Sequence, residues 1–223
     1  MYVATLIANS KNRNLSELIL KQVVNDLGGV KYKVLDDNIA IDINLVSEPS
    51  NFEIVWKQLQ KHQIDIVLQP IKNRRKNILL ADMDSTMIEQ ECIDELADEA
   101  GVGKRVAEIT KRAMNGELDF EDALIERVKL LKGLSTEIIV NVLKSRITLM
   151  PGAESLIKTM KNNGSYCALV SGGFTDFTEA ISKILGFDEN RANTLLQKNK
   201  ILTGEVQFPI LGRQAKVEAL TDI

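Results

Sequence analysis

The strongest constraint on the fold is a short apolar run, Ile78–Ala81, followed directly by Asp82-Met83-Asp84-Ser85-Thr86. In an extended segment, side chains at positions i and i+2 share one face, so the two carboxylates would lie together at the end of a strand. Two negative charges held close together repel each other. The pattern therefore predicts a nearby cation, and a hard ion with oxygen ligands such as Mg²⁺ is the usual one. The alternative, a helix N-cap at Asp84 or Ser85, leaves Asp82 unexplained.

The composition indicates a folded protein without a strong electrostatic field. Among 223 residues the net charge is −3 and 44% are hydrophobic, enough for one large core or two smaller ones. This charge gives no reason to expect nucleic acid or a membrane surface as a partner. Cys92 and Cys167 lack metal-type spacing and are expected as free thiols in a reducing compartment. Without a bilayer-length apolar stretch or a signal-peptide pattern, we expect a soluble, cytoplasmic protein.

Residues 1–72 are expected to form a small α+β domain. Their apolar pattern predicts the order strand, helix, strand, strand, helix, strand, which is typical of a ferredoxin-like domain. The expected elements are Tyr2–Ile7, Leu15–Leu27, Lys31–Leu35, Ile39–Leu45, Phe52–Gln60 and Asp65–Leu68. The domain could sense a ligand or join two copies as a homodimer, and a packing role without a ligand is equally open.

The polar, basic stretch 72–77 is interpreted as a solvated linker. Beyond it, residues 73–223 are expected to form an α/β domain in which helices separate parallel strands. A helical segment at about 88–147 follows the first strand and would form a cap over the strand's tip.

Two strand ends in this domain carry polar groups. One is Asp82 with Asp84, and the other is Ser171-Gly172-Gly173, which follows the predicted strand Tyr166–Val170. The adjacent glycines and the start of the next helix would let an anion approach the backbone. Ligands of open α/β sheets bind at the carboxyl ends of strands, so we expect one site here. Lys216, on a later helix, could balance phosphoryl charge, although a surface lysine is the commoner case.

The order of these motifs resembles the haloacid dehalogenase superfamily. The matching parts are Asp82-x-Asp84-Ser85-Thr86, then Ser171-Gly172-Gly173-Phe174, then Lys216. Residues 82–91 and 114–131 are similar to superfamily members that act on O-phosphoserine. The resemblance covers residues 78–223 and implies a Rossmann-like parallel sheet with a helical cap. The first domain is similar to the amino-acid-sensing, ACT-like domains attached to many bacterial members.

The resemblance implies a Mg²⁺-dependent hydrolase that converts O-phospho-L-serine to L-serine and phosphate in serine biosynthesis. Asp82 would attack phosphorus and form an aspartyl-phosphate. Asp84 would protonate the departing oxygen and then activate water. The Mg²⁺ ion would contact the Asp82 carboxylate and the Asp84 carbonyl. Ser171-Gly172-Gly173 and Lys216 would hold the phosphoryl oxygens.

Substrate selection would fall to the helical segment. The resemblance assigns Glu91 to the substrate ammonium and Arg127 to its carboxylate, which an arginine can bind through two parallel hydrogen bonds. The helical spacing supports Arg127, because an arginine on an apolar stripe needs a partner or a ligand. The alternative is an arginine that pairs with a neighbouring glutamate. Met114 and Phe120 would line the pocket, although either could be plain core.

One motif of the superfamily has no counterpart in this sequence. The resemblance implies a Gly-Asp-Gly-x-Asn-Asp segment after the helix of Lys216, with an aspartate that completes the magnesium site, whereas the sequence ends at Ile223. We therefore expect a domain without its C-terminal part, a first strand at the sheet edge, and little magnesium-dependent phosphate release by this chain alone. The alternatives are a weakly active or inactive copy that binds phosphoserine or serine as a regulatory protein, and a domain whose missing strand another chain supplies.

Overall fold

The computed structural model describes all 223 residues, which divide into two compact units, Met1–Lys76 and Asn77–Ile223. The boundary falls inside the basic stretch 72–77 rather than at its start. The stretch is not wholly solvated, because the Arg74 guanidinium donates to both carboxylate oxygens of Asp42 at 2.6 and 2.8 Å. It also donates to Thr5 Oγ1 at 2.9 Å. Part of the predicted linker is therefore anchored in the first unit.

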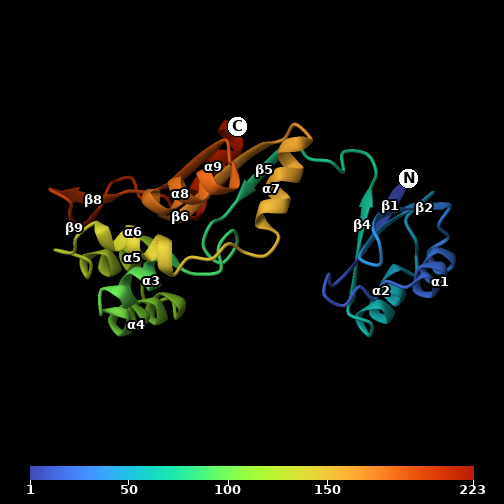
Figure 1. Cartoon of the computed structure of the whole chain (residues 1–223), viewed down its shortest axis with the longest axis horizontal. Helices are drawn as coiled ribbons and strands as arrows, with labels where there is room; N and C mark the ends of the chain where they lie inside the picture. Colours follow the sequence, from blue (N-terminus) through green and yellow to red (C-terminus); the bar gives the residue numbers. More distant parts are fainter. The chain divides into compact units, whose positions relative to one another are not determined.

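The first unit contains a four-stranded sheet and two helices (Figure 1). Its elements are β1 (Tyr2–Ala8), α1 (Glu17–Leu27), β2 (Lys31–Asp36), β3 (Ala40–Leu45), α2 (Phe52–Gln60) and β4 (Ile64–Pro70). The strand order is β2-β3-β1-β4, and every neighbouring pair is antiparallel. Side chains alternate along a strand, so one sheet face supplies Leu6 and Ile43 to a core shared with both helices.

The second unit contains a parallel sheet of three strands, which confirms the predicted α/β class. Its elements are β5 (Ile78–Ala81), α3 (Cys92–Glu99), α4 (Gly103–Met114), α5 (Phe120–Lys129), α6 (Glu137–Ser145), α7 (Ala153–Asn162), β6 (Tyr166–Phe174), α8 (Thr175–Leu185), β7 (Glu189–Asn193), β8 (Leu195–Lys198), β9 (Ile201–Val206) and α9 (Arg213–Asp222). The sheet order is β5-β6-β7, and β8 and β9 form a separate antiparallel hairpin. None of the helices combines the length and apolar character needed to span a bilayer.

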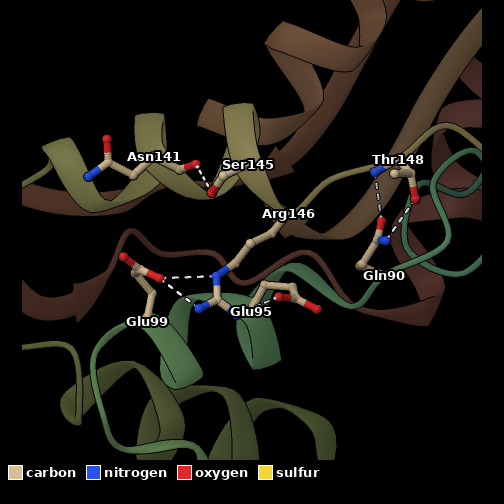
Figure 2. Close-up of polar contacts among 7 residues, drawn as sticks. All are labelled: Gln90, Glu95, Glu99, Asn141, Ser145, Arg146 and Thr148. Carbon is tan, nitrogen blue, oxygen red and sulfur yellow. Dashed lines mark hydrogen bonds and ion pairs between the residues drawn. The ribbon is translucent and has the colours of Figure 1, made fainter.

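Helices α3–α6 form a group inserted between β5 and β6 (green to yellow in Figure 1). The chain enters and leaves this group along two adjacent segments, because Ile88 and Leu149 form an antiparallel bridge. The Gln90 amide reinforces the pair: it donates to Thr148 Oγ1 at 2.8 Å and accepts from the Thr148 N–H at 2.9 Å (Figure 2). Arg146 then joins the end of α6 to α3 by ion pairs with Glu95 and Glu99 (Figure 2).

Strand β6 does not end at Val170 as the sequence suggested, but continues through Ser171-Gly172-Gly173 to Phe174. Its register with β7 shifts between Val170, which pairs with Arg191, and Phe174, which pairs with Asn193. The serine and the two glycines therefore form an irregular stretch inside the strand.

Candidate active site

A cavity of about 340 Å³ lies in the second unit beyond the carboxyl end of β5. Residues from the β5 end, the irregular stretch of β6, helix α5 and the start of α9 line it. They are Asp82, Asp84, Glu91, Ile93, Phe120, Leu124, Arg127, Ser171, Gly172, Gly173, Phe174, Gly212, Arg213 and Lys216. The cavity thus brings together every predicted site residue except Met114.

Met114 does not line this cavity. It is the last residue of α4 and is 83% exposed. Helix α4 buries Val106 and Ile109, and Met114 lies on a different side of the helix from Ile109. Its side chain instead borders a second hollow between α3 and α4, beside Asp94.

Asp82 follows β5 directly and presents a carboxylate that is 38% exposed. One oxygen, Oδ1, accepts a hydrogen bond from the Met83 N–H at 2.9 Å. The other, Oδ2, lies 2.6 Å from Lys216 Nζ. Lys216 belongs to α9, so a residue far along the chain places a positive charge beside Asp82. The accessible, charge-balanced carboxylate is suited to act as a nucleophile.

Asp84 occupies a more enclosed position than Asp82. Its Oδ1 accepts from the Cys92 N–H at 3.0 Å, and Ser171 Oγ donates to its Oδ2 at 3.4 Å. Burial raises the pKa of Asp84, the nearby charges of Glu91 and Asp82 raise it further, and hydrogen bonds from Cys92 oppose the change. The two carboxylates therefore have different environments, as an acid and a nucleophile in one site require.

In the irregular stretch of β6, the two glycines leave their backbone open to the cavity because they carry no side chains. A Cβ atom on Gly173 would lie 2.6 Å from Asp84 Oδ2, and one on Gly172 would lie 2.9 Å from Phe120 Cζ. Ser171 is 2% exposed, and its Oγ accepts from the Gly173 N–H at 2.9 Å. A side chain at either position would therefore displace the Asp84 carboxylate or the Phe120 ring from its present place.

Arg127 reaches the cavity from α5 without forming an ion pair. Its Nε donates to the Ala123 carbonyl of the same helix at 3.1 Å. Burial lowers the pKa of Arg127, while the charges of Asp94 and Glu91 act in the opposite direction. The alternative of a pair with a neighbouring glutamate is not what the structure contains. A largely buried guanidinium with free donors is a suitable site for a carboxylate ligand.

Glu91 stands at the start of α3 and is held by a hydrogen bond from Ser85 Oγ to its Oε1 at 2.6 Å. The bond fixes a negative charge at the wall of the same cavity that Arg127 lines. One acidic and one basic group facing a common space can bind an ammonium and a carboxylate of a single small molecule.

The site offers carboxylate oxygens to a metal ion, but no group of three or more His, Cys, Asp or Glu side chains could hold one. Mg²⁺ commonly uses one or two carboxylates and takes its other ligands from water and a bound phosphate. The Asp82 carboxylate therefore fits Mg²⁺ in its donor chemistry, and the Asp84 backbone carbonyl is the second protein ligand that the resemblance implies.

Arg213 is a cavity residue that the sequence analysis did not single out. It lies in the first turn of α9, three residues before Lys216, and residues three apart share a helix face. This spacing from a suspected site lysine is the signal that could have identified it.

The family model of haloacid dehalogenase-like (HAD) hydrolases matches residues 79–223. The phosphoserine phosphatase of Archaeoglobus fulgidus is 43% identical over 169 residues, 75% of this chain and 49% of that protein. The chain thus spans about half the length of this curated relative.

Two solved structures are also similar to the chain. A phospho-aspartyl intermediate analogue of phosphoserine phosphatase is 46% identical, with a TM-score of 0.61 over 67% of this chain and 71% of that one. A HAD family hydrolase from Salmonella enterica is 26% identical, with a TM-score of 0.81 over 99% of this chain and 77% of that one.

Proposed function

The chain belongs to the haloacid dehalogenase-like hydrolase family, and from this we propose that it hydrolyses O-phospho-L-serine to L-serine and phosphate. The observation that carries the proposal is the shared cavity of Asp82, Lys216 and Arg127. It offers a nucleophile beside a cation at one end and an unpaired guanidinium on the wall. The relatives named phosphoserine phosphatase support this substrate.

In the first half of the reaction, an oxygen of Asp82 attacks phosphorus and the bond from phosphorus to the serine oxygen breaks. The departing oxygen takes a proton from Asp84, whose raised pKa favours the protonated form that this step needs. The products are free serine and an aspartyl-phosphate on Asp82.

In the second half, water attacks phosphorus and gives a proton to Asp84, which is now a base. The bond between phosphorus and the Asp82 oxygen breaks, so both carboxyl groups return to their starting states. The same carboxyl group acts as acid and then as base because each half-reaction reverses its protonation.

The phosphoryl oxygens would be held by Ser171, the Gly172 backbone and Lys216. Mg²⁺, held by Asp82 and Asp84, would neutralise part of the phosphoryl charge when bound. Arg127 would bind the substrate carboxylate and Glu91 the ammonium, as their positions in the cavity wall support.

We further propose that α3–α6 act as a cap that opens and closes over the cavity. The first unit is interpreted as a ferredoxin-like, ACT-like domain, which its βαββαβ order and its β2-β3-β1-β4 sheet support. The buried, free thiols of Cys92 and Cys167 are consistent with a cytoplasmic location.

The test is release of phosphate from O-phosphoserine with Mg²⁺, at protein concentrations high enough to resolve slow turnover. Asp82→Asn is the matched control, because it keeps the shape of the side chain and removes the nucleophile. We expect slow release by the wild type and none by the variant. Equal release by both would show that Asp82 is not the nucleophile, and no release by either would contradict hydrolysis.

A further inference from the structure

One buried side chain that the proposed mechanism does not use links two walls of the cavity. Asn193 is the last residue of β7 and is 2% exposed. Its Nδ2 donates to the carbonyl oxygens of Gly172 at 2.8 Å and Leu211 at 3.1 Å. Its Oδ1 accepts from the Leu211 N–H at 2.7 Å. The amide thus joins the irregular stretch of β6 to the segment that leads into α9.

These contacts define the orientation of the amide. Two carbonyl oxygens require its N–H donors, and one backbone N–H requires its oxygen, so only one placement of nitrogen and oxygen satisfies all three. The β6–β7 ladder is interrupted between Val170 and Phe174, so a side chain here takes the place of a missing backbone partner. An aspartate would lose both donors, and an aliphatic residue would lose all three bonds.

Helix α9 depends on such polar contacts because it has little apolar surface in the core. Ala215 and Ala219 are its only buried residues. Besides the bonds of Asn193 before its first turn, Arg191 pairs with Asp222 in its last turn at 2.7 Å. Both contacts come from β7, so this strand holds α9 at its two ends.

We propose that Asn193 is a positioning residue that fixes Lys216 of α9 relative to the Gly172 backbone, so that one phosphate group can contact both. This inference rests on the proposed function, which assigns phosphate to these groups. A misplaced hydrogen bond to a charged group costs about 10-fold or more in affinity. We therefore expect the loss of Asn193 to weaken phosphate binding by roughly 10-fold or more.

The experiment compares Asn193→Leu and Asn193→Asp with the wild type and with Asn190→Leu. Asn190 is the matched control, because it lies on the same strand and accepts a hydrogen bond from Thr178 Oγ1 at 2.8 Å, outside the cavity lining. Three quantities are measured: the Kd of inorganic phosphate by calorimetry, amide hydrogen exchange by mass spectrometry, and the Tm.

We expect both Asn193 variants to raise the Kd and to speed exchange in the segments 171–174 and 210–216 together, whereas Asn190→Leu changes neither. If Asn193 had only a structural role, its substitution would lower the Tm and leave the Kd of the folded protein for phosphate unchanged. Asn193 variants that match the control in Kd and exchange would overturn the inference. If the wild type binds phosphate but does not hydrolyse phosphoserine, the proposed function fails while the same comparison still decides the role of Asn193.

Discussion

The buried position of the Asp84 carboxylate suits the proposed reaction but destabilises the folded protein. Burial raises its pKa, so in the folded protein the charged form is less favourable than in the unfolded chain. The folded state therefore binds the proton more tightly, and stability falls as the pH rises from the ordinary value of 3.8 through the raised value. The full penalty is present once the pH exceeds the raised pKa.

We predict that Asp84→Asn raises the Tm at pH 7, by roughly 2–4 °C for a gain of about 1 kcal/mol, and abolishes phosphate release. The asparagine keeps an oxygen that can accept from the Cys92 N–H but carries no charge. The gain should shrink as the pH is lowered below 3.8, where the wild-type carboxyl group becomes protonated in both states. A gain that does not depend on pH would contradict this explanation.

Arg127 provides the second prediction at the residue scale. Its free donors should bind the substrate carboxylate, and a charged hydrogen-bonded contact is worth about 1.5–3 kcal/mol. We therefore expect Arg127→Ala to lower kcat/KM for phosphoserine by roughly 10- to 100-fold. Turnover of an aryl phosphate, which has no carboxylate, should change much less.

Arg127→Lys is the matched variant, because it keeps the charge and loses the paired donor geometry. It should recover only part of the activity towards phosphoserine. Equal losses on both substrates in Arg127→Ala would show that the residue does not select the carboxylate.

The sequence predicted those cavity residues whose role can be recognised from their residue type and their place in a local pattern. Asp82 and Asp84 follow β5, the glycines lie near the end of β6, and Arg127 interrupts an apolar stripe. Asn193 had no such signal, because its role depends on two segments that meet only in the folded chain. Met114 was included through resemblance alone, and its position at an exposed helix end was not visible in the sequence.

At the scale of elements, the ends of a helix could be predicted where the local sequence determines them. Helix α2 lies where the apolar pattern placed it. Helix α5 ends at Lys129, and beyond it the Gly133 N–H donates to the Leu202 carbonyl of β9 at 2.9 Å, a contact with the hairpin that spacing cannot reveal. Strand β7 was missed because Glu189–Asn193 is polar and lacks the apolar run of a buried parallel strand.

The start of α5 is a local signal that also matters for the site. Asp119 Oδ1 accepts from the Asp122 N–H at 2.8 Å and caps the helix that carries Phe120 and Arg127. We predict that Asp119→Ala destabilises the second unit by about 1 kcal/mol, because the first-turn donor loses its partner. Urea unfolding measures this loss.

Asp119→Ser is the control for the cap, since serine can accept the same hydrogen bond. It should recover most of the stability that alanine loses. If serine and alanine destabilise equally, the loss comes from the negative charge near the helix start rather than from the hydrogen bond.

At the scale of the whole molecule, the two units have separate hydrophobic cores. Each core draws only on residues of its own unit, so each unit is expected to unfold as its own cooperative step. A substitution in one unit should then move one transition and leave the other in place. The Arg74 contact with Asp42 and Thr5 offers a test, because all three residues belong to the first unit.

Asp42 is 9% exposed, and burial by itself would raise its pKa. Hydrogen bonds from Arg74 and Thr5 outweigh that effect, so the pKa of Asp42 lies below its ordinary value of 3.8. The contribution to stability is therefore present above pH 3.8 and is lost as the pH falls through the lowered value.

We predict that Arg74→Ala destabilises the first unit by about 1–3 kcal/mol at neutral pH, because it leaves the Asp42 carboxylate buried without its cation. Calorimetry should show one transition moved to lower temperature and the other unchanged. The double variant Arg74→Ala, Asp42→Asn should recover part of the loss, since it removes the unpaired charge as well. A shift of both transitions by the single variant would mean that the two units unfold together, and no shift at all would mean that the Arg74 contact does not stabilise the first unit.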